Sequence, residues 1–137
     1  MLTDQQIDNA KKETIYPFAP HNQHNDCIRI CYEWLDAQVK TKNAQTFIHD
    51  WKFLIRPWAK RYVSKTDIMV AALLHPDVFG KFPYYNISKR YTEPSIGRLY
   101  EIPEAFKHMD YEIRTNDRNC YKFYEKAGSR FPVTERK

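Results

Sequence analysis

The chain has 137 residues, about the size of one domain, and its 22 Lys and Arg against 17 Asp and Glu give a formal charge of +5. Its three glycines form no Gly-rich phosphate loop of the Walker or dinucleotide-binding type, and its three cysteines do not make a paired disulfide framework. No apolar run approaches the roughly 20 residues of a membrane span, and residues 1–12 are polar, unlike a signal peptide. We therefore expect a cytoplasmic domain with no membrane partner and, with 15% aromatic residues, a hydrophobic core.

Residues 1–24 are predicted to form an N-terminal arm outside the main domain. Ile7 and Ala10 allow one or two helical turns. Pro17 and Pro20 stop any helix from continuing, because proline lacks a backbone N–H and restricts the residue before it. We expect the aromatic residues beside these prolines to dock the arm on the domain.

The main domain is predicted to begin with two helices. Apolar side chains at helical spacing predict a helix over 25–40, capped by Asn25 or Asp26. A second helix is predicted over 44–55. It is expected to end before Pro57, because proline does not continue a helix.

Two more helices are predicted further along the domain. Ser64 and Asp67 form a variant of the capping box, and the apolar residues 68–74 follow without a break. This third helix is therefore expected to be short, buried on most sides and ended before Pro76. A fourth helix is predicted over 92–102, from the spacing of its apolar residues.

Two segments of alternating polarity, 111–115 and 120–125, flank a turn cluster and predict a β-hairpin. Residues 25–126 then have the element order of a winged helix-turn-helix domain, an α+β and mostly helical fold. In that fold the helix over 92–102 would enter the major groove of DNA, and the hairpin would be the wing. Residues 127–137 are predicted to be a frayed, basic C-terminal tail.

Basic residues concentrate in three stretches with few or no acidic residues, 52–65, 81–90 and 114–122. In a winged domain these stretches would share one face and neutralise the phosphates of double-stranded DNA. We therefore predict a small, non-enzymatic DNA-binding regulator that needs no cofactor. The side chains predicted to contact DNA are Lys60, Arg61, Lys65, Lys81, Tyr84, Tyr85, Asn86, Ser88, Lys89, Arg90, Arg98, Arg114, Arg118 and Lys122.

The alternative function is a protein-interaction module, such as a small inhibitor or adaptor. The same tyrosines and basic side chains would then bind the acidic surface of a protein partner. Ten tyrosines are many to hide in one core, so a homodimer is a further use of the exposed ones.

Two patterns suggest chemistry, and a structural role is favoured for each. His21, His24, Cys27 and Cys31 are suitable zinc ligands, but their close spacing leaves almost no loop to wrap around the ion. We therefore expect no bound metal. The remaining histidines lie on separate predicted elements with no catalytic spacing, so no enzyme activity is predicted from His49, His75 and His108.

Overall fold

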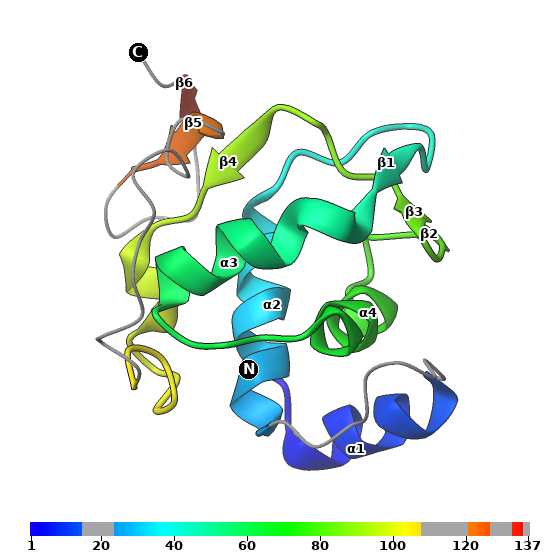
Figure 1. Ribbon diagram of the computed structural model, residues 1–137, viewed down its shortest axis with the longest axis vertical. Helices are drawn as coiled ribbons and strands as arrows, with labels where there is room; N and C mark the ends of the chain where they lie inside the picture. The colour runs from blue at the N-terminus through cyan, green and yellow to red at the C-terminus, as the bar shows by residue number, and fades with distance from the viewer. Residues whose placement is uncertain (15–23, 108–120, 127–132, 136–137) are drawn as a thin grey trace.

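Figure 1 shows a computed structural model of the chain, which describes residues 1–14, 24–107, 121–126 and 133–135. Over these residues the fold is α+β, as predicted, with four α-helices and two small three-stranded sheets. The two sheets lie at one end of the molecule and helix α1 lies at the other (Figure 1). None of the described helices is long and apolar enough to cross a membrane.

Helix α2 (Asn25–Ala37) runs through the middle of the fold and is buried along most of its length (Figure 1). Helix α4 (Lys65–Leu74) packs along α2, and helix α1 (Asp4–Glu13) packs on both. Helix α3 (Trp51–Ala59) also packs against α2 but keeps an outward face. Most residues of α2 and α4 are therefore buried.

The predicted N-terminal arm contains a longer helix than the one or two turns expected. Thr3 caps α1, because its hydroxyl accepts the N–H of Gln6 at 3.2 Å and the side chain of Gln6 accepts the N–H of Thr3 at 2.8 Å. Ile7 and Ala10 are buried in the core that α1 shares with α2 and α4. Residues 15–23, with both prolines of the arm, lie outside the described residues.

The capping box predicted at the start of α4 is confirmed. The hydroxyl of Ser64 accepts the N–H of Asp67 at 3.1 Å, and the carboxylate of Asp67 accepts the N–H of Ser64 at 2.9 Å. These bonds satisfy backbone donors that the first turn of a helix leaves unpaired. Helix α2 is capped by His24, and not by Asn25 or Asp26 as predicted, since Nδ1 of His24 accepts the N–H of Asp26 at 2.9 Å.

The predicted helix over 44–55 is wrong at both ends. Strand β1 (Thr46–Phe47) and the 3₁₀ helix η1 (Ile48–Asp50) come before α3, which then continues through Pro57. Proline removes one hydrogen bond inside a helix. Burial of the apolar face of α3, including Trp58, offsets that loss.

The predicted helix over 92–102 is also wrong. The structure has strand β4 (Tyr91–Glu93) and the short 3₁₀ helix η2 (Ile96–Leu99) in its place. The side chain of Gln38 bonds to both the N–H and the C=O of Thr92 at 2.8 Å, and a helix would need those groups for its own bonds. Because this contact is tertiary, the spacing of apolar residues does not report it. The winged helix-turn-helix prediction therefore loses its groove-reading helix.

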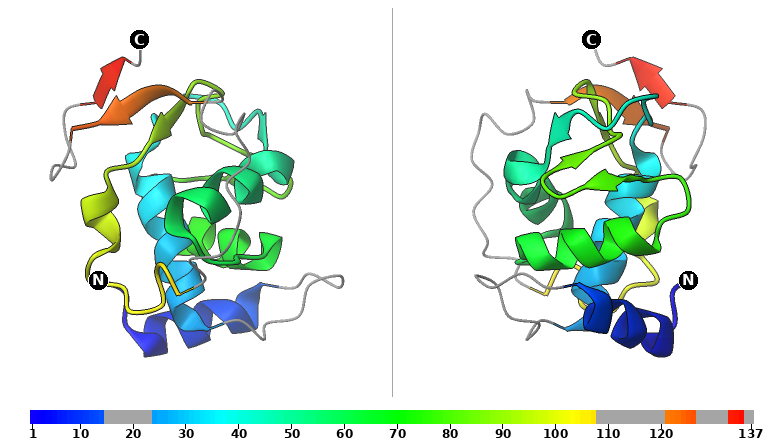
Figure 2. Two further views of the ribbon diagram at one scale, coloured as in Figure 1. Left: turned by 60° about the vertical axis from the view of Figure 1, so that its left-hand side comes forward. Right: turned by 90° about the vertical axis from the view of Figure 1, so that its right-hand side faces the viewer.

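The predicted C-terminal strand is present and pairs with two other strands among the described residues. Strand β5 (Tyr121–Glu125) lies between β4, to which it is parallel, and β6 (Val133–Glu135), to which it is antiparallel. The predicted frayed tail therefore contributes a strand. The predicted hairpin partner, 111–115, lies outside the described residues. Figure 2 shows β4, β5 and β6 side by side at one end of the molecule.

The second sheet consists of three two-residue strands in the order β1–β3–β2, where β2 is Gly80–Lys81 and β3 is Tyr84–Tyr85. Both outer strands run antiparallel to β3. The sequence predicts neither β2 nor β3, because two residues are too few to show the alternation that marks a strand.

Candidate nucleic-acid interface

The outer face of the β1–β3–β2 sheet carries aromatic and basic side chains. The register places Phe47 opposite Tyr84, and Tyr84 opposite Lys81, so these three side chains share one face. On the other face Thr46 and Tyr85 are buried against the core. The face with Phe47, Tyr84 and Lys81 is therefore the one that meets solvent.

The rings on this face contact one another. The centroids of Phe47 and Tyr84 lie 5.6 Å apart with the ring planes inclined by 42°, and His49 stacks on Phe47 at 5.6 Å. Phe47 is 47% exposed and Tyr84 is 49% exposed. About half of the surface of each residue is therefore open to a ligand.

Lys65, the first residue of α4, extends this row of side chains. Its Nζ lies 3.2 Å from Nδ1 of His49. An ammonium group can only donate, so Nδ1 of His49 is the acceptor in this contact. The row therefore runs from Lys81 through Tyr84, Phe47 and His49 to Lys65.

Helix α3 adds two basic side chains that lie over aromatic rings. The ammonium of Lys52 is 5.2 Å from the centroid of Phe53, and the guanidinium of Arg56 is 4.3 Å from that of Tyr62. Cation–π contacts of this kind are attractive and orient the charged groups. We call the combined set of side chains the basic–aromatic surface: Phe47, His49, Lys52, Phe53, Arg56, Tyr62, Lys65, Lys81 and Tyr84.

The positive charges of this surface repel one another. Burial, Arg56 and Lys65, in that order of importance, lower the pKa of the Lys52 ammonium. Within the part of the chain that the structure describes, none of Lys52, Lys65 and Lys81 pairs with a carboxylate. Asp50 adds one exposed negative charge before α3. A bound polyanion would relieve the repulsion, which is the property expected of a phosphate-binding surface.

Of the side chains predicted to contact DNA, the structure brings three onto this surface, namely Lys65, Lys81 and Tyr84. Five others are exposed or partly exposed but lie elsewhere on the molecule, namely Lys60, Arg61, Ser88, Lys89 and Arg90. Lys60 follows the last residue of α3 and has a left-handed backbone conformation. Nη2 of Arg61 lies 3.4 Å from the carboxylate of Glu104, with which it forms an ion pair. Lys89 is exposed, and the hydroxyl of Ser88 accepts the N–H of Arg90 at 3.1 Å.

Three predicted contact residues are buried instead, namely Tyr85, Asn86 and Arg98. Oδ1 of Asn86 accepts the N–H of Phe79 at 2.7 Å, and its amide nitrogen donates to the carbonyl of Asp77 at 3.0 Å. These bonds hold the loop before β2 against the residues after β3. Asn86 is therefore engaged within the fold and has no exposed group for reading bases.

The third basic stretch is described only at its end, because Arg114 and Arg118 lie outside the described residues. Lys122 is exposed on β5. The guanidinium of Arg90 lies 4.8 Å from the ring centroid of Phe123 on the same strand. These side chains form a smaller basic group on the other sheet, separate from the basic–aromatic surface.

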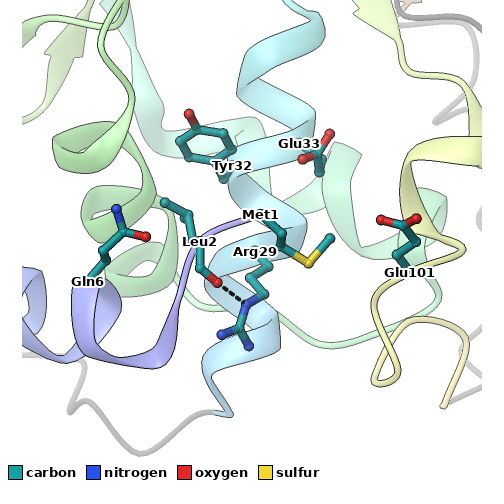
Figure 3. Close-up of a pocket in the computed structure, with 7 residues that line it drawn as sticks. All are labelled: Met1, Leu2, Gln6, Arg29, Tyr32, Glu33 and Glu101. Carbon is teal, nitrogen blue, oxygen red and sulfur yellow. Dashed lines mark hydrogen bonds between the residues drawn. The ribbon is translucent and has the colours of Figure 1, made fainter.

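A pocket of about 350 Å³ lies between the N-terminal residues and α2 (Figure 3). Its basic side chain, Arg29, donates to the carbonyl of Leu2 at 2.9 Å, to Asp26 at 2.6 Å and to Asp4 at 2.7 Å. These bonds tie the start of α1 to α2. Because they engage Arg29 within the fold, the pocket does not offer its positive charge to a ligand.

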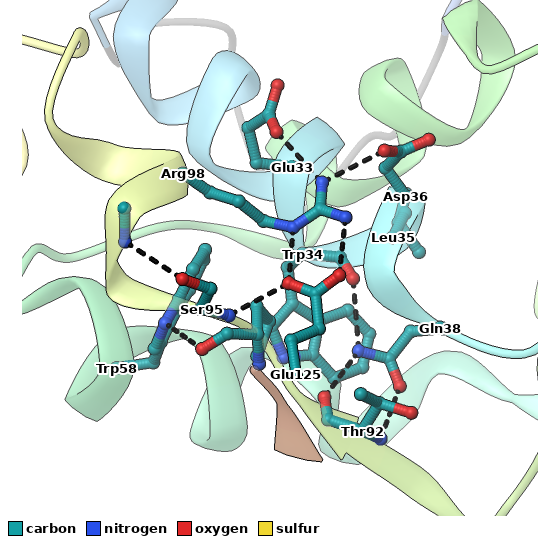
Figure 4. Close-up of polar contacts among 12 residues, drawn as sticks. Glu33, Trp34, Leu35, Asp36, Gln38, Trp58, Thr92, Ser95, Arg98 and Glu125 are labelled. Carbon is teal, nitrogen blue, oxygen red and sulfur yellow. Dashed lines mark hydrogen bonds and ion pairs between the residues drawn. The ribbon is translucent and has the colours of Figure 1, made fainter. Parts of the chain in front are cut away.

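Arg98 lies in the core, where its side chain is 1% exposed. Its Nε and Nη2 donate to the two oxygens of Glu125 at 2.6 and 2.7 Å, and its Nη1 donates to Glu33 at 3.0 Å and Asp36 at 2.9 Å (Figure 4). Burial opposes the charged form, but the bonds to Glu125 and Asp36 raise the pKa of Arg98 above its usual value. This cluster fastens β5 and η2 to α2.

His75 completes the same cluster. Its Nε2 lies 2.8 Å from the carboxylate of Asp36, and its Nδ1 accepts the N–H of Asp77 at 3.1 Å. The bond from His75, with help from Arg98, holds the pKa of Asp36 well below its usual range despite burial. With both nitrogens engaged and its side chain 1% exposed, His75 has a structural role. His108 lies outside the described residues.

The two helical cysteines are buried thiols. Burial raises the pKa of Cys27 to about 12 and that of Cys31 well above its usual value, which disfavours the thiolate that a metal needs. Cys27 also donates to the carbonyl of Tyr62 at 3.5 Å. Among the described residues no group of three or more His, Cys, Asp or Glu is arranged to hold a metal ion, and His21 lies outside that set.

Gly80→Ala is expected to distort the outer sheet face. Gly80 has φ of 144°, and a Cβ there would lie 2.2 Å from the carbonyl oxygen of Tyr84. We expect the free energy of unfolding to fall by more than about 1 kcal/mol, measured by urea denaturation. Lys81→Ala, at the next residue with an exposed side chain, should change it by less than about 0.5 kcal/mol. Equal stability of the two variants would contradict the need for glycine at position 80.

A scan against known protein families, together with searches of characterised proteins and of solved structures, finds no match for this chain.

Proposed function

We propose that the protein binds nucleic acid without catalysing a reaction on it, and that the basic–aromatic surface contacts the phosphate backbone. The observation that carries the proposal is that basic side chains from 52–65 and Lys81 from 81–90 lie on one exposed surface. Lys65 from the first and Lys81 from the second lie at opposite ends of a row of rings. Basic side chains without carboxylate partners favour a polyanion, because each phosphate contact releases condensed counterions.

This mode of binding does not need a helix in the major groove. Helix α4 packs on α1 and α2 with most of its side chains buried, and the segment predicted to read bases contains β4. We therefore replace the winged-helix form of the hypothesis with backbone contacts made by side chains. Such contacts position a nucleic acid but carry little sequence information.

A salt titration tests the proposal. The affinity for a fluorescently labelled oligonucleotide should fall linearly with salt on a log–log plot, with a slope that reports the number of phosphate contacts. The double variant Lys52→Gln/Lys65→Gln should reduce that slope by about 2 and weaken binding by at least about tenfold at low salt. The proposal would be contradicted if the affinity of the native protein showed almost no dependence on salt, or if the native protein did not bind at low salt.

A matched control separates this surface from the overall positive charge. Lys12 is an exposed residue of α1, at the opposite end of the molecule from the two sheets (Figure 1). Lys12→Gln should leave the slope almost unchanged. An equal loss in Lys12→Gln and in Lys52→Gln alone would mean that net charge, and not this surface, drives binding.

An acidic protein surface is the second candidate ligand. The exposed residues Phe79 and Phe82 flank β2 and would add apolar contact area, as aromatic residues do at protein interfaces. Retention of one defined protein after nuclease digestion of a lysate, together with no salt-dependent binding of oligonucleotides, would favour this alternative.

A further inference from the structure

We propose that the ligand of the basic–aromatic surface is single-stranded nucleic acid, whose unpaired bases stack on Phe47 and Tyr84. This inference rests on the function proposed above and names its ligand class. The observation behind it is the order of side chains on the sheet face, where two half-exposed rings lie between basic groups.

The rings are held in place before any ligand arrives. Strand register sets Phe47 opposite Tyr84, and their neighbours Thr46 and Tyr85 anchor the other face of the sheet in the core. Ligand binding therefore costs little conformational entropy for ordering the rings. Because every base has a flat π-face, rings fixed in this way favour stacking with little dependence on sequence.

A double helix cannot use these rings. Its bases are stacked on one another, so their faces are covered, and a side chain on a flat sheet meets only the backbone and the groove edges. A single strand exposes the base faces. The lysines attract both forms through their phosphates, whereas the rings favour only the single strand.

The basic groups lie where a single strand of nucleic acid that crosses the rings would carry its phosphates. Lys81 adjoins Tyr84 through the register of β2 and β3, and Lys65 bonds to the His49 ring that stacks on Phe47. A nucleic-acid strand that follows this row would meet a positive charge at each end and the aromatic rings between them. The charge and the rings therefore suit one extended polyanion with exposed bases.

The experiment compares a labelled single strand of about 12 nucleotides with a duplex of the same length, using the full chain at low salt. The native protein should bind the single strand at least about tenfold more tightly. Phe47→Leu and Tyr84→Leu should each lose about tenfold in single-strand affinity and leave duplex affinity almost unchanged. A 2-aminopurine base in the strand should lose fluorescence on binding to the native protein and much less on binding to either variant.

Two further variants guard against trivial explanations. Tyr84→Phe keeps the ring and should retain single-strand binding within about twofold. Tyr100→Leu removes an aromatic residue that is 73% exposed but lies outside the basic–aromatic surface, and it should have no effect. Circular dichroism of each variant verifies that it is folded.

The outcomes separate this inference from the proposed function. Equal, salt-dependent affinity for single strand and duplex, with no effect of Phe47→Leu, would overturn the stacking inference and leave phosphate binding in place. A loss of both affinities in Phe47→Leu and Tyr84→Leu, with the fold intact, would overturn it as well. No binding of either form at low salt would overturn both.

Discussion

Replacing Arg98 by Met is expected to lower the free energy of unfolding by about 3–5 kcal/mol. The substitution leaves Glu33 and Glu125 buried without the guanidinium that donates to them, and their side chains are 8% and 0% exposed. Water cannot replace the lost bonds at such depth. Lys at this position should also destabilise, because an ammonium cannot form the two parallel bonds that Arg98 makes with Glu125. Urea denaturation measures both losses.

Arg61→Met is the matched control for this prediction. Arg61 pairs with Glu104 at 3.4 Å, and that carboxylate is partly exposed, so we expect a loss of about 1 kcal/mol or less. The double variant Arg98→Met/Glu125→Met should be less destabilised than the sum of the two single variants, because it removes both charges together. An Arg98→Met protein within about 1 kcal/mol of the native one would contradict the buried cluster.

Acid is expected to weaken the fold through the same cluster. The pKa of Asp36 is held well below its usual range by His75 and Arg98, so the folded state keeps this carboxylate charged where the unfolded chain protonates it. The stabilisation is complete above the unfolded pKa of about 3.9 and is lost as the pH falls through the folded value. As the pH falls below about 4, the free energy of unfolding should therefore decrease through the protonation of Asp36 in the unfolded chain.

Asp36→Asn isolates this contribution from the other carboxylates. The variant is less stable than the native protein near neutral pH, but its free energy of unfolding should fall less steeply as the pH is lowered from about 5. Urea denaturation at several pH values gives both curves. Parallel curves for the native protein and the variant would show that Asp36 titrates alike in the folded and unfolded chains.

Helix α4 could be predicted from the sequence because its signals are local. Ser64 and Asp67 cap each other three residues apart, and the apolar run that follows is buried on most sides as its pattern indicates. Strand β4 could not be predicted in this way. Its backbone is bonded by Gln38, which is far from Thr92 in the chain, so its conformation depends on a contact that exists only in the folded state.

The candidate surface was predictable in its charge but not in its geometry. Lys65 and Lys81 stand in acid-free stretches that a sequence reveals directly. Phe47 and His49 fall inside the segment predicted as the helix over 44–55, where nothing marks them as exposed. The pairing of Tyr84 with Phe47 and Lys81 brings the rings and one lysine onto one face, and the contact of Lys65 with His49 adds the other lysine.

Arg98 was predicted to contact DNA but is buried. The sequence alone does not distinguish an exposed basic side chain from a buried one.

Composition and spacing by themselves determined the α+β class, the excess of positive charge and the stretches in which it is concentrated, since these follow from residue counts and local periodicity. The tertiary structure alone decided which basic side chains have carboxylate partners. Glu33, Asp36 and Glu125 reach Arg98 from separate elements, whereas Lys65 and Lys81 have no such partner among the described residues. The physical reason is that the interaction between two charges depends on their distance in space. Residues that are close in space can be far apart in the chain, so the local sequence does not identify such pairs.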